Sequence, residues 1–258
     1  MRNILAVAGK ELRAYFHSPI AYLVLTIYSV LCGYFFYVLT GGFVMESFRM
    51  QMSESGQFPM SLNEMIIRPL FAGILTIILA LFLMPLISMR LYAEEKRTGT
   101  IELLLTSPLT DLEVILGKFF GALALFLVMV LMTFLYIGLL FIYGNPDAKP
   151  LLANALGFVL FGAALLALGM WVSTFTKNQI IAAVVSASLF LLLYVLDWVS
   201  AFSSSAAGRV MSYMSMPTHF DNFTKGVIDS GDLVYYLSVI VLGIFLTARS
   251  VEALKGRT

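Results

Sequence analysis

Long apolar runs alternate with short polar segments along the whole chain. A helix needs roughly 20 apolar residues to cross the hydrocarbon core of a bilayer, and six runs come close to that length or exceed it. They span residues 20–40, 70–89, 119–143, 151–172, 180–196 and 233–248. The runs are too continuous for the alternating strands of a membrane barrel, and their backbone groups must be paired within hydrocarbon. The pattern predicts an all-α membrane protein with six transmembrane helices in a single domain, residues 1–258.

A short amphipathic segment, residues 1–19, precedes the first span. Its apolar residues recur at helical spacing on one face, and its basic residues lie on another. The apolar residues are Leu5, Ala8, Leu12, Tyr15 and Phe16, and the basic side chains are Lys10, Arg13 and His17. This predicts a helix in the headgroup layer of the membrane. A simple anchor and a surface that contacts a partner protein would both have this pattern.

The distribution of Lys and Arg predicts the orientation of the spans, because cytoplasmic loops carry an excess of these residues. With a cytoplasmic N-terminus, only five of the 16 Lys and Arg residues fall outside, in or beside the outer segments 41–67 and 199–232 and the short loop before residue 151. Those five are Arg49, Arg68, Lys149, Arg209 and Lys225. Six spans return the chain to its starting side, so both termini are predicted to be cytoplasmic.

Composition supports a membrane location and narrows the chemistry. The chain is 60% hydrophobic and 12% charged, whereas a soluble domain carries about a quarter charged residues. A net charge of +1 gives no basic surface for nucleic acid. The single cysteine, Cys32, allows neither an intramolecular disulfide nor a thiol-rich metal cage.

The sequence offers no site for intrinsic catalysis. The spans have no charged side chain away from their ends, which argues against proton coupling but leaves sodium coupling through backbone carbonyls open. Gly117 and Lys118 resemble the end of a phosphate-binding loop, but Leu112 stands where glycine is required and Phe119 where Ser or Thr is required. We therefore expect no enzyme, no directly bound cofactor and no metal site.

Charge concentrates instead in residues 90–118, between spans two and three, a segment that we call the hairpin. Glycine at position 99 predicts the end of a helix whose last turn carries solvated charges. The segment after it predicts a short amphipathic helix, and a T-x-x-E capping box starts the third span. The residues concerned are Glu94, Glu95, Lys96 and Arg97 before Gly99, then Thr100, Ile101, Glu102, Leu104, Leu105, Ser107 and Pro108, and finally Thr110 and Glu113. A helix resting on lipid and a helix docking on another protein both fit this pattern.

The run "PLISMRLYAEEKRTGTIELLLTSPLTDLEVILGKFFG", from Pro85, resembles the signature of the type-2 ABC export permease family. The matching residues, in order, are Glu95, Arg97, Gly99, Thr100, Glu102, Leu104, Leu105, Ser107, Pro108, Gly117 and Lys118. A second run, "PTHFDNFTKGVIDSGDLVYYL" from Pro217, is similar to the region before the last span of gliding-motility permeases.

The resemblance implies a function for the hairpin. In this family it is a cytoplasmic coupling helix, seated in a groove of a separate ABC ATPase subunit, and ATP-driven closure of two such subunits moves the spans. The coupling residues that it implies are Glu94 and those of the signature from Glu95 to Pro108. The resemblance further implies a second permease, homologous or identical, ATP and Mg²⁺ bound by the ATPase, and a location in the bacterial inner membrane.

The outer segments contain Met50, Met52, Met214, Met216 and His219. Thioether sulfur at M-x-M spacing suits Cu(I), but methionine is also an adaptable packing residue. We favour packing, because methionine is abundant throughout the chain.

Two other functions remain open at this point. A stand-alone secondary carrier or channel would need no ATPase, although we find no internal repeat between the two halves of the chain. A membrane scaffold of an envelope complex would do mechanical work, in keeping with the gliding-motility resemblance.

Overall fold

The structure is a computed structural model, and it describes residues 2–52, 61–101, 109–201 and 206–255. Every regular element in these ranges is a helix, which confirms the predicted fold class. The helices are α1 (Arg2–His17), α2 (Pro19–Met52), η1 (Asn63–Ile67), α3 (Arg68–Ala72), α4 (Ile74–Ser88), α5 (Arg90–Thr98), α7 (Asp111–Tyr143), α8 (Ala148–Ser173), α9 (Gln179–Ala201), α10 (Ala206–Met214), α11 (Met216–Thr224) and α12 (Ser230–Lys255). The described residues contain six helical segments long and apolar enough to cross a membrane.

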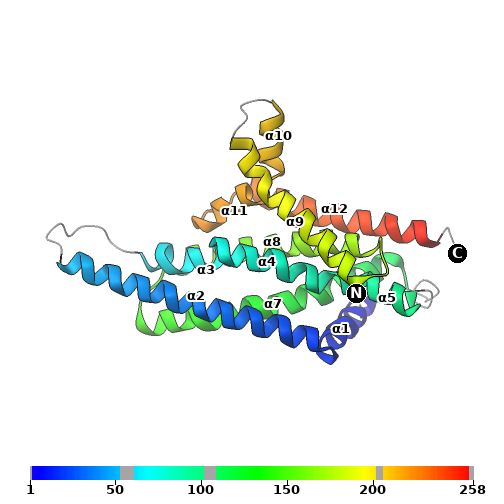
Figure 1. The fold of residues 1–258 in the computed structure, drawn as a ribbon, viewed down its shortest axis with the longest axis horizontal. Helices are drawn as coiled ribbons and strands as arrows, with labels where there is room; N and C mark the ends of the chain where they lie inside the picture. Colours follow the sequence, from blue (N-terminus) through cyan, green and yellow to red (C-terminus); the bar gives the residue numbers. More distant parts are fainter. Residues whose placement is uncertain (1, 53–60, 102–108, 202–205, 256–258) are drawn as a thin grey trace.

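The long helices run side by side along the longest axis of the molecule, with α8 packed among its neighbours (Figure 1). One end carries α1, α5 and both termini, and we call it the hairpin end. The far end carries the end of α2, together with η1 and α3, while α9 leans out of the bundle and leads into α10. The polar hairpin and both termini therefore share one end of the molecule.

The second span is a composite of several helices. It begins with the π-helix η1, continues as α3 and α4, and passes into α5 at Met89. Between α3 and α4 the chain is extended at Gly73, with φ −61° and ψ 145°. A Cβ atom at Gly73 would lie 2.2 Å from the carbonyl oxygen of Pro69, so this break requires glycine. Broken helices are tolerated at membrane depth where they are buried in protein or line a cavity.

The first span is longer than the apolar run that predicts it. The run ends near residue 40, but α2 continues to Met52 and has 34 residues. At 1.5 Å per residue its length is about 51 Å, well beyond the roughly 30 Å of hydrocarbon. The final turns of α2 therefore extend past the membrane at the far end.

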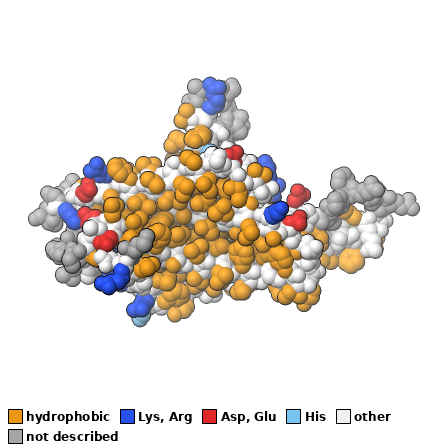
Figure 2. Space-filling view, turned by 180° about the vertical axis from the view of Figure 1, so that it is seen from behind, with side chains coloured by type: hydrophobic (Ala, Val, Ile, Leu, Met, Phe, Trp, Pro, Cys, Tyr) orange, Lys and Arg blue, Asp and Glu red, His pale blue; other side chains and the backbone are white. Residues whose placement is uncertain are grey.

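Apolar side chains cover the outside of the bundle. Figure 2 shows a broad hydrophobic face with charged side chains gathered toward the ends of the molecule. On α2, α9 and α12 large apolar side chains are more than half exposed, among them Tyr22, Ile180 and Val241. Soluble monomers rarely expose apolar area on this scale. Such a surface is stable in contact with lipid or with other membrane helices.

Candidate functional site

The candidate site is built where α1 packs against the first turns of α7. Gly117 and Gly121, four residues apart, let the two helices approach closely. A Cβ at Gly117 would lie 2.5 Å from the Cβ of Val7, and one at Gly121 would lie 2.7 Å from the Cβ of Glu11. No side chain fits in either place. The G-x-x-x-G spacing is the signal for this contact, and it was not used in predicting the fold from sequence.

Lys118 follows Gly117 and is at the centre of a buried ion cluster. Its Nζ atom lies 2.8 Å from Oε1 of Glu11 on α1 and 2.7 Å from Oε1 of Glu95 on α5. The side chain of Lys118 is 1% exposed, and those of Glu11 and Glu95 are 12% and 13% exposed. Three helices are thus joined through one ammonium group, which lies over the ring of Tyr92 at 5.3 Å from its centre.

Two charged residues of α5 are less solvated than expected. Glu95 lies against Lys118 of α7 and Lys10 of α1, contacts that the local pattern of α5 does not reveal. Lys96 donates a hydrogen bond to the carbonyl oxygen of Thr174, at the end of α8. The prediction of a fully solvated last turn was wrong for these two residues, whereas Arg97 is exposed.

A second set of contacts ties α1 to the junction of α4 and α5. Tyr15 donates a hydrogen bond of 2.6 Å to the carbonyl oxygen of Ile87. Burial raises the pKa of Tyr15, and the nearby Glu11 carboxylate raises it further, so the phenol stays protonated. Arg90 lies over the Tyr15 ring, 5.6 Å from its centre, and pairs with Glu94 at 2.7 Å.

Several buried polar atoms of this region have no hydrogen-bond partner within the described residues. They are Nη1 of Arg90, the hydroxyl of Tyr92 and Oε2 of Glu95. Most buried polar groups in proteins are paired, so a cluster of exceptions calls for an explanation. These unpaired groups can form new hydrogen bonds if α5 moves relative to α1 and α7.

Within the hairpin, the end of α5 and the start of α7 are both defined by local signals in the sequence. Gly99 ends α5 in the left-handed region, with φ 75°. Thr110 and Glu113 form both hydrogen bonds of a capping box at the start of α7. Thr100 is exposed beyond Gly99. Residues 102–108, which include the predicted Glu102, Leu104, Leu105, Ser107 and Pro108, lie outside the described residues.

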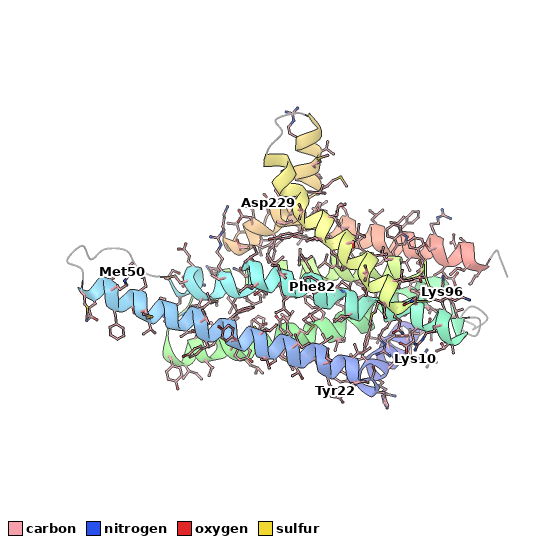
Figure 3. The ribbon with its side chains drawn as sticks, viewed as in Figure 1. Lys10, Tyr22, Met50, Phe82, Lys96 and Asp229 are labelled. Atoms are coloured by element: carbon pink, nitrogen blue, oxygen red, sulfur yellow. The ribbon has the colours of Figure 1, made fainter. Side chains whose placement is uncertain are left out.

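The capped start of α7 also contacts both terminal helices. Asn3 of α1 donates to Glu113 at 3.0 Å, and Lys255 of α12 contacts Asp111 at 2.5 Å. The hairpin end is therefore a connected unit of α1, α5, α7 and α12. Figure 3 shows Lys10 and Lys96 at this end, and Met50 at the opposite end of the molecule.

The profile of the ABC-2 family transporter proteins matches residues 5–247. The chain belongs to the ABC-2 transporter family. A comparison with curated proteins gives no significant match. Membership agrees with the family resemblance of the hairpin, while the gliding-motility subgroup stays a prediction.

ABC-2 permease domains are membrane components that are not themselves catalytic, and the family implies an ABC ATPase as partner. In the part of the chain that the structure describes, no group of three or more His, Cys, Asp or Glu side chains could hold a metal ion.

The outer candidate residues lie apart from the hairpin, on α2 and on α10 and α11. Met52 is exposed at the end of α2, whereas Met216 is buried at the start of α11. The two ring nitrogens of His219 lie 2.7 Å from Oδ1 of Asp232 and 2.9 Å from the carbonyl oxygen of Tyr213. His219 thus joins α10, α11 and α12.

Proposed function

We propose that this chain is the membrane-spanning permease subunit of an ATP-binding cassette exporter in the bacterial inner membrane. A separate ATPase subunit, present in two copies, binds ATP and Mg²⁺ and hydrolyses ATP. The hairpin docks on this subunit from the cytoplasmic side. A second permease, homologous or identical, lies beside the chain in the membrane.

The ion cluster of Lys118, Glu11 and Glu95 is the observation that carries the proposal. A force applied to the hairpin reaches α5 and α7 directly, and Lys118 of α7 pairs both with Glu95 of α5 and with Glu11 of α1. Packed cores shift between discrete arrangements rather than deforming continuously. The cluster would therefore transmit movement of the hairpin to the base of two spans and to the interfacial helix at once.

The position of the termini supports the proposed orientation. Both termini lie at the hairpin end, together with most of the basic residues that the sequence assigns to the inside (Figure 1). An ATPase in the cytoplasm would meet α1, α5 and the hairpin together. The exposed apolar faces of α9 and α12 offer surface for lipid and for the second permease.

The test is to purify the chain alone and together with its ATPase, and to measure ATP hydrolysis in proteoliposomes. The chain alone should hydrolyse no ATP. With the ATPase bound, Glu95→Lys, which places two ammonium groups against each other, and Leu104→Asp, in the hairpin, should each abolish assembly or stimulated hydrolysis. Glu46→Lys is the matched control, because Glu46 is partly exposed on α2 toward the far end.

Normal assembly and coupled turnover in both hairpin variants would contradict the proposal. Solute movement driven by an ion gradient, without any ATPase, would instead identify a secondary carrier.

A further inference from the structure

Two cavities adjoin at the broken end of the second span. The larger has a volume of about 480 Å³ and the smaller about 170 Å³, and they share Glu64, Arg68 and Thr224 as lining residues. Ligand sites in proteins occupy roughly 300–1,000 Å³. The break at Gly73 and the π-helix η1 form one side of the site, and α11 packs against α3 on the other. Local π-helices are frequent at functional sites.

Two cationic side chains, Arg68 and Lys225, line the cavities and are available to bind an anion. The carboxylate of Asp221 lies between two cations, with Oδ1 at 3.3 Å from Nη2 of Arg68 and Oδ2 at 2.5 Å from Nζ of Lys225. All three side chains are about half exposed. A guanidinium has five N–H groups and an ammonium three, so one carboxylate leaves donors on both cations available to an anion.

The smaller cavity also offers acceptors. Asn154 lines it and is 1% exposed. Its Nδ2 atom donates to the carbonyl oxygens of Pro150 at 2.8 Å and of Thr224 at 3.3 Å, which fixes the orientation of the amide. Oδ1 of Asn154 is therefore left as a buried acceptor without a partner in the described residues. The exposed carboxylate of Glu64 lines both cavities, so a ligand that supplies N–H donors would bind both groups.

The larger cavity adds an apolar wall formed by Pro69, Ala72, Ile77 and Phe220. A phosphate alone would leave the acceptors unpaired, and an amine alone would leave the cations unused. A choline headgroup carries charge but has no N–H donor. A phospholipid with a primary ammonium has all three complementary parts.

We propose that these cavities bind a zwitterionic aminophospholipid such as phosphatidylethanolamine. Its phosphate contacts Arg68 and Lys225, its ammonium donates to Glu64 and Asn154, and an acyl chain follows the apolar wall. The site lies toward the end of the molecule opposite the hairpin (Figure 1). It depends on no ATPase and on no direction of transport, so it can fail without affecting the proposed function.

The test is a titration of the purified, delipidated chain in detergent, followed by native mass spectrometry and thermal stability. The probes are phosphatidylethanolamine, phosphatidylcholine and phosphatidylglycerol with identical acyl chains, together with soluble glycerophosphoethanolamine. Phosphatidylethanolamine should bind about tenfold more tightly than phosphatidylcholine, because only its ammonium donates charge-assisted hydrogen bonds. Glu64→Gln should abolish this preference, and Arg68→Gln should weaken binding of all three lipids.

Glu46→Gln is the control, since it removes a partly exposed carboxylate from α2 outside the cavities. It should change none of the affinities. Equal affinity of the wild-type chain for phosphatidylethanolamine and phosphatidylcholine would overturn the proposal, whether or not any variant folds. Persistence of the preference in Glu64→Gln would do so as well. Binding of glycerophosphoethanolamine as tight as that of the lipid would overturn the lipid assignment and identify a soluble aminophosphate instead.

Discussion

Replacing Lys118 by methionine tests the buried ion cluster most severely. The substitution keeps an unbranched chain but removes the ammonium that Glu11 and Glu95 share. Both carboxylates are nearly buried, at 12% and 13% exposure, and would then face each other without a cation between them. Removing one partner of a buried ion pair lowers stability by roughly 3–5 kcal/mol. Because both carboxylates keep some contact with solvent, we expect a loss of about 3 kcal/mol in the free energy of unfolding.

The assay is reversible unfolding in mixed micelles, with the chain in the same detergent throughout. Lys10→Met is the matched control at the same cluster, because Lys10 is 66% exposed and lies 4.0 Å from Glu95. Exposed pairs of this kind contribute about 0–1 kcal/mol. Combining Lys118→Met with Glu11→Gln and Glu95→Gln removes the uncompensated charges and should recover most of the lost stability. If Lys118→Met unfolds within 1 kcal/mol of the wild type, the cluster does not hold these helices together.

Three further substitutions test the structure around the hairpin. Gly117→Ala should destabilise the chain by about 1–3 kcal/mol and expose α1 to limited proteolysis, since the added methyl group overlaps Val7. The control is Gly138→Ala, which has open space around it and should be neutral or stabilising. Equal effects of the two substitutions would refute the close packing of α1 on α7. Thr110→Ala should lower stability by about 1 kcal/mol and speed hydrogen exchange in the first turn of α7, because it removes the cap; unchanged exchange there would count against the cap. Gly99→Ala should lower stability by roughly 1–2 kcal/mol, because its φ of 75° strains any residue with a Cβ; no change on thermal unfolding would show that α5 ends differently.

The apolar runs predict the number and type of the spans because hydrophobic length is a local property. The helix ends at the hairpin are also set by local sequence: Gly99 ends α5, and Thr110 with Glu113 caps the start of α7. The break at Gly73 is less visible in sequence, since glycine within an apolar run is common in membrane helices. Glycine is required there because, once the chain is extended at this position, a Cβ would lie 2.2 Å from the carbonyl oxygen of Pro69.

The candidate site was predictable only in part. Sequence indicated that the hairpin is charged, but not that Glu95 is covered. Lys118, which pairs with Glu95, is 23 residues away along the chain, and Glu11, which pairs with the same Lys118, is 84 residues from Glu95. Burial of a charge depends on which helices pack together, and that depends on small residues such as Gly117 and Gly121. The cavity at Arg68 likewise combines residues from η1, α3, α4, α9 and α11, so no single segment indicates it.

The central claim, that the hairpin is the contact through which a separate ATPase moves the membrane helices, is tested most directly by site-specific cross-linking in intact cells. A photoreactive amino acid replaces Arg97, which is exposed in the last turn of α5, and in a second chain it replaces Met52, which is 87% exposed at the far end of α2. We expect the probe at position 97 to cross-link an ATP-binding protein and the probe at position 52 to give no such product. Labelling of an Arg97→Cys variant by a membrane-impermeant thiol reagent added outside the cell, with no ATP-binding protein cross-linked to the photoreactive probe at position 97, would contradict the account.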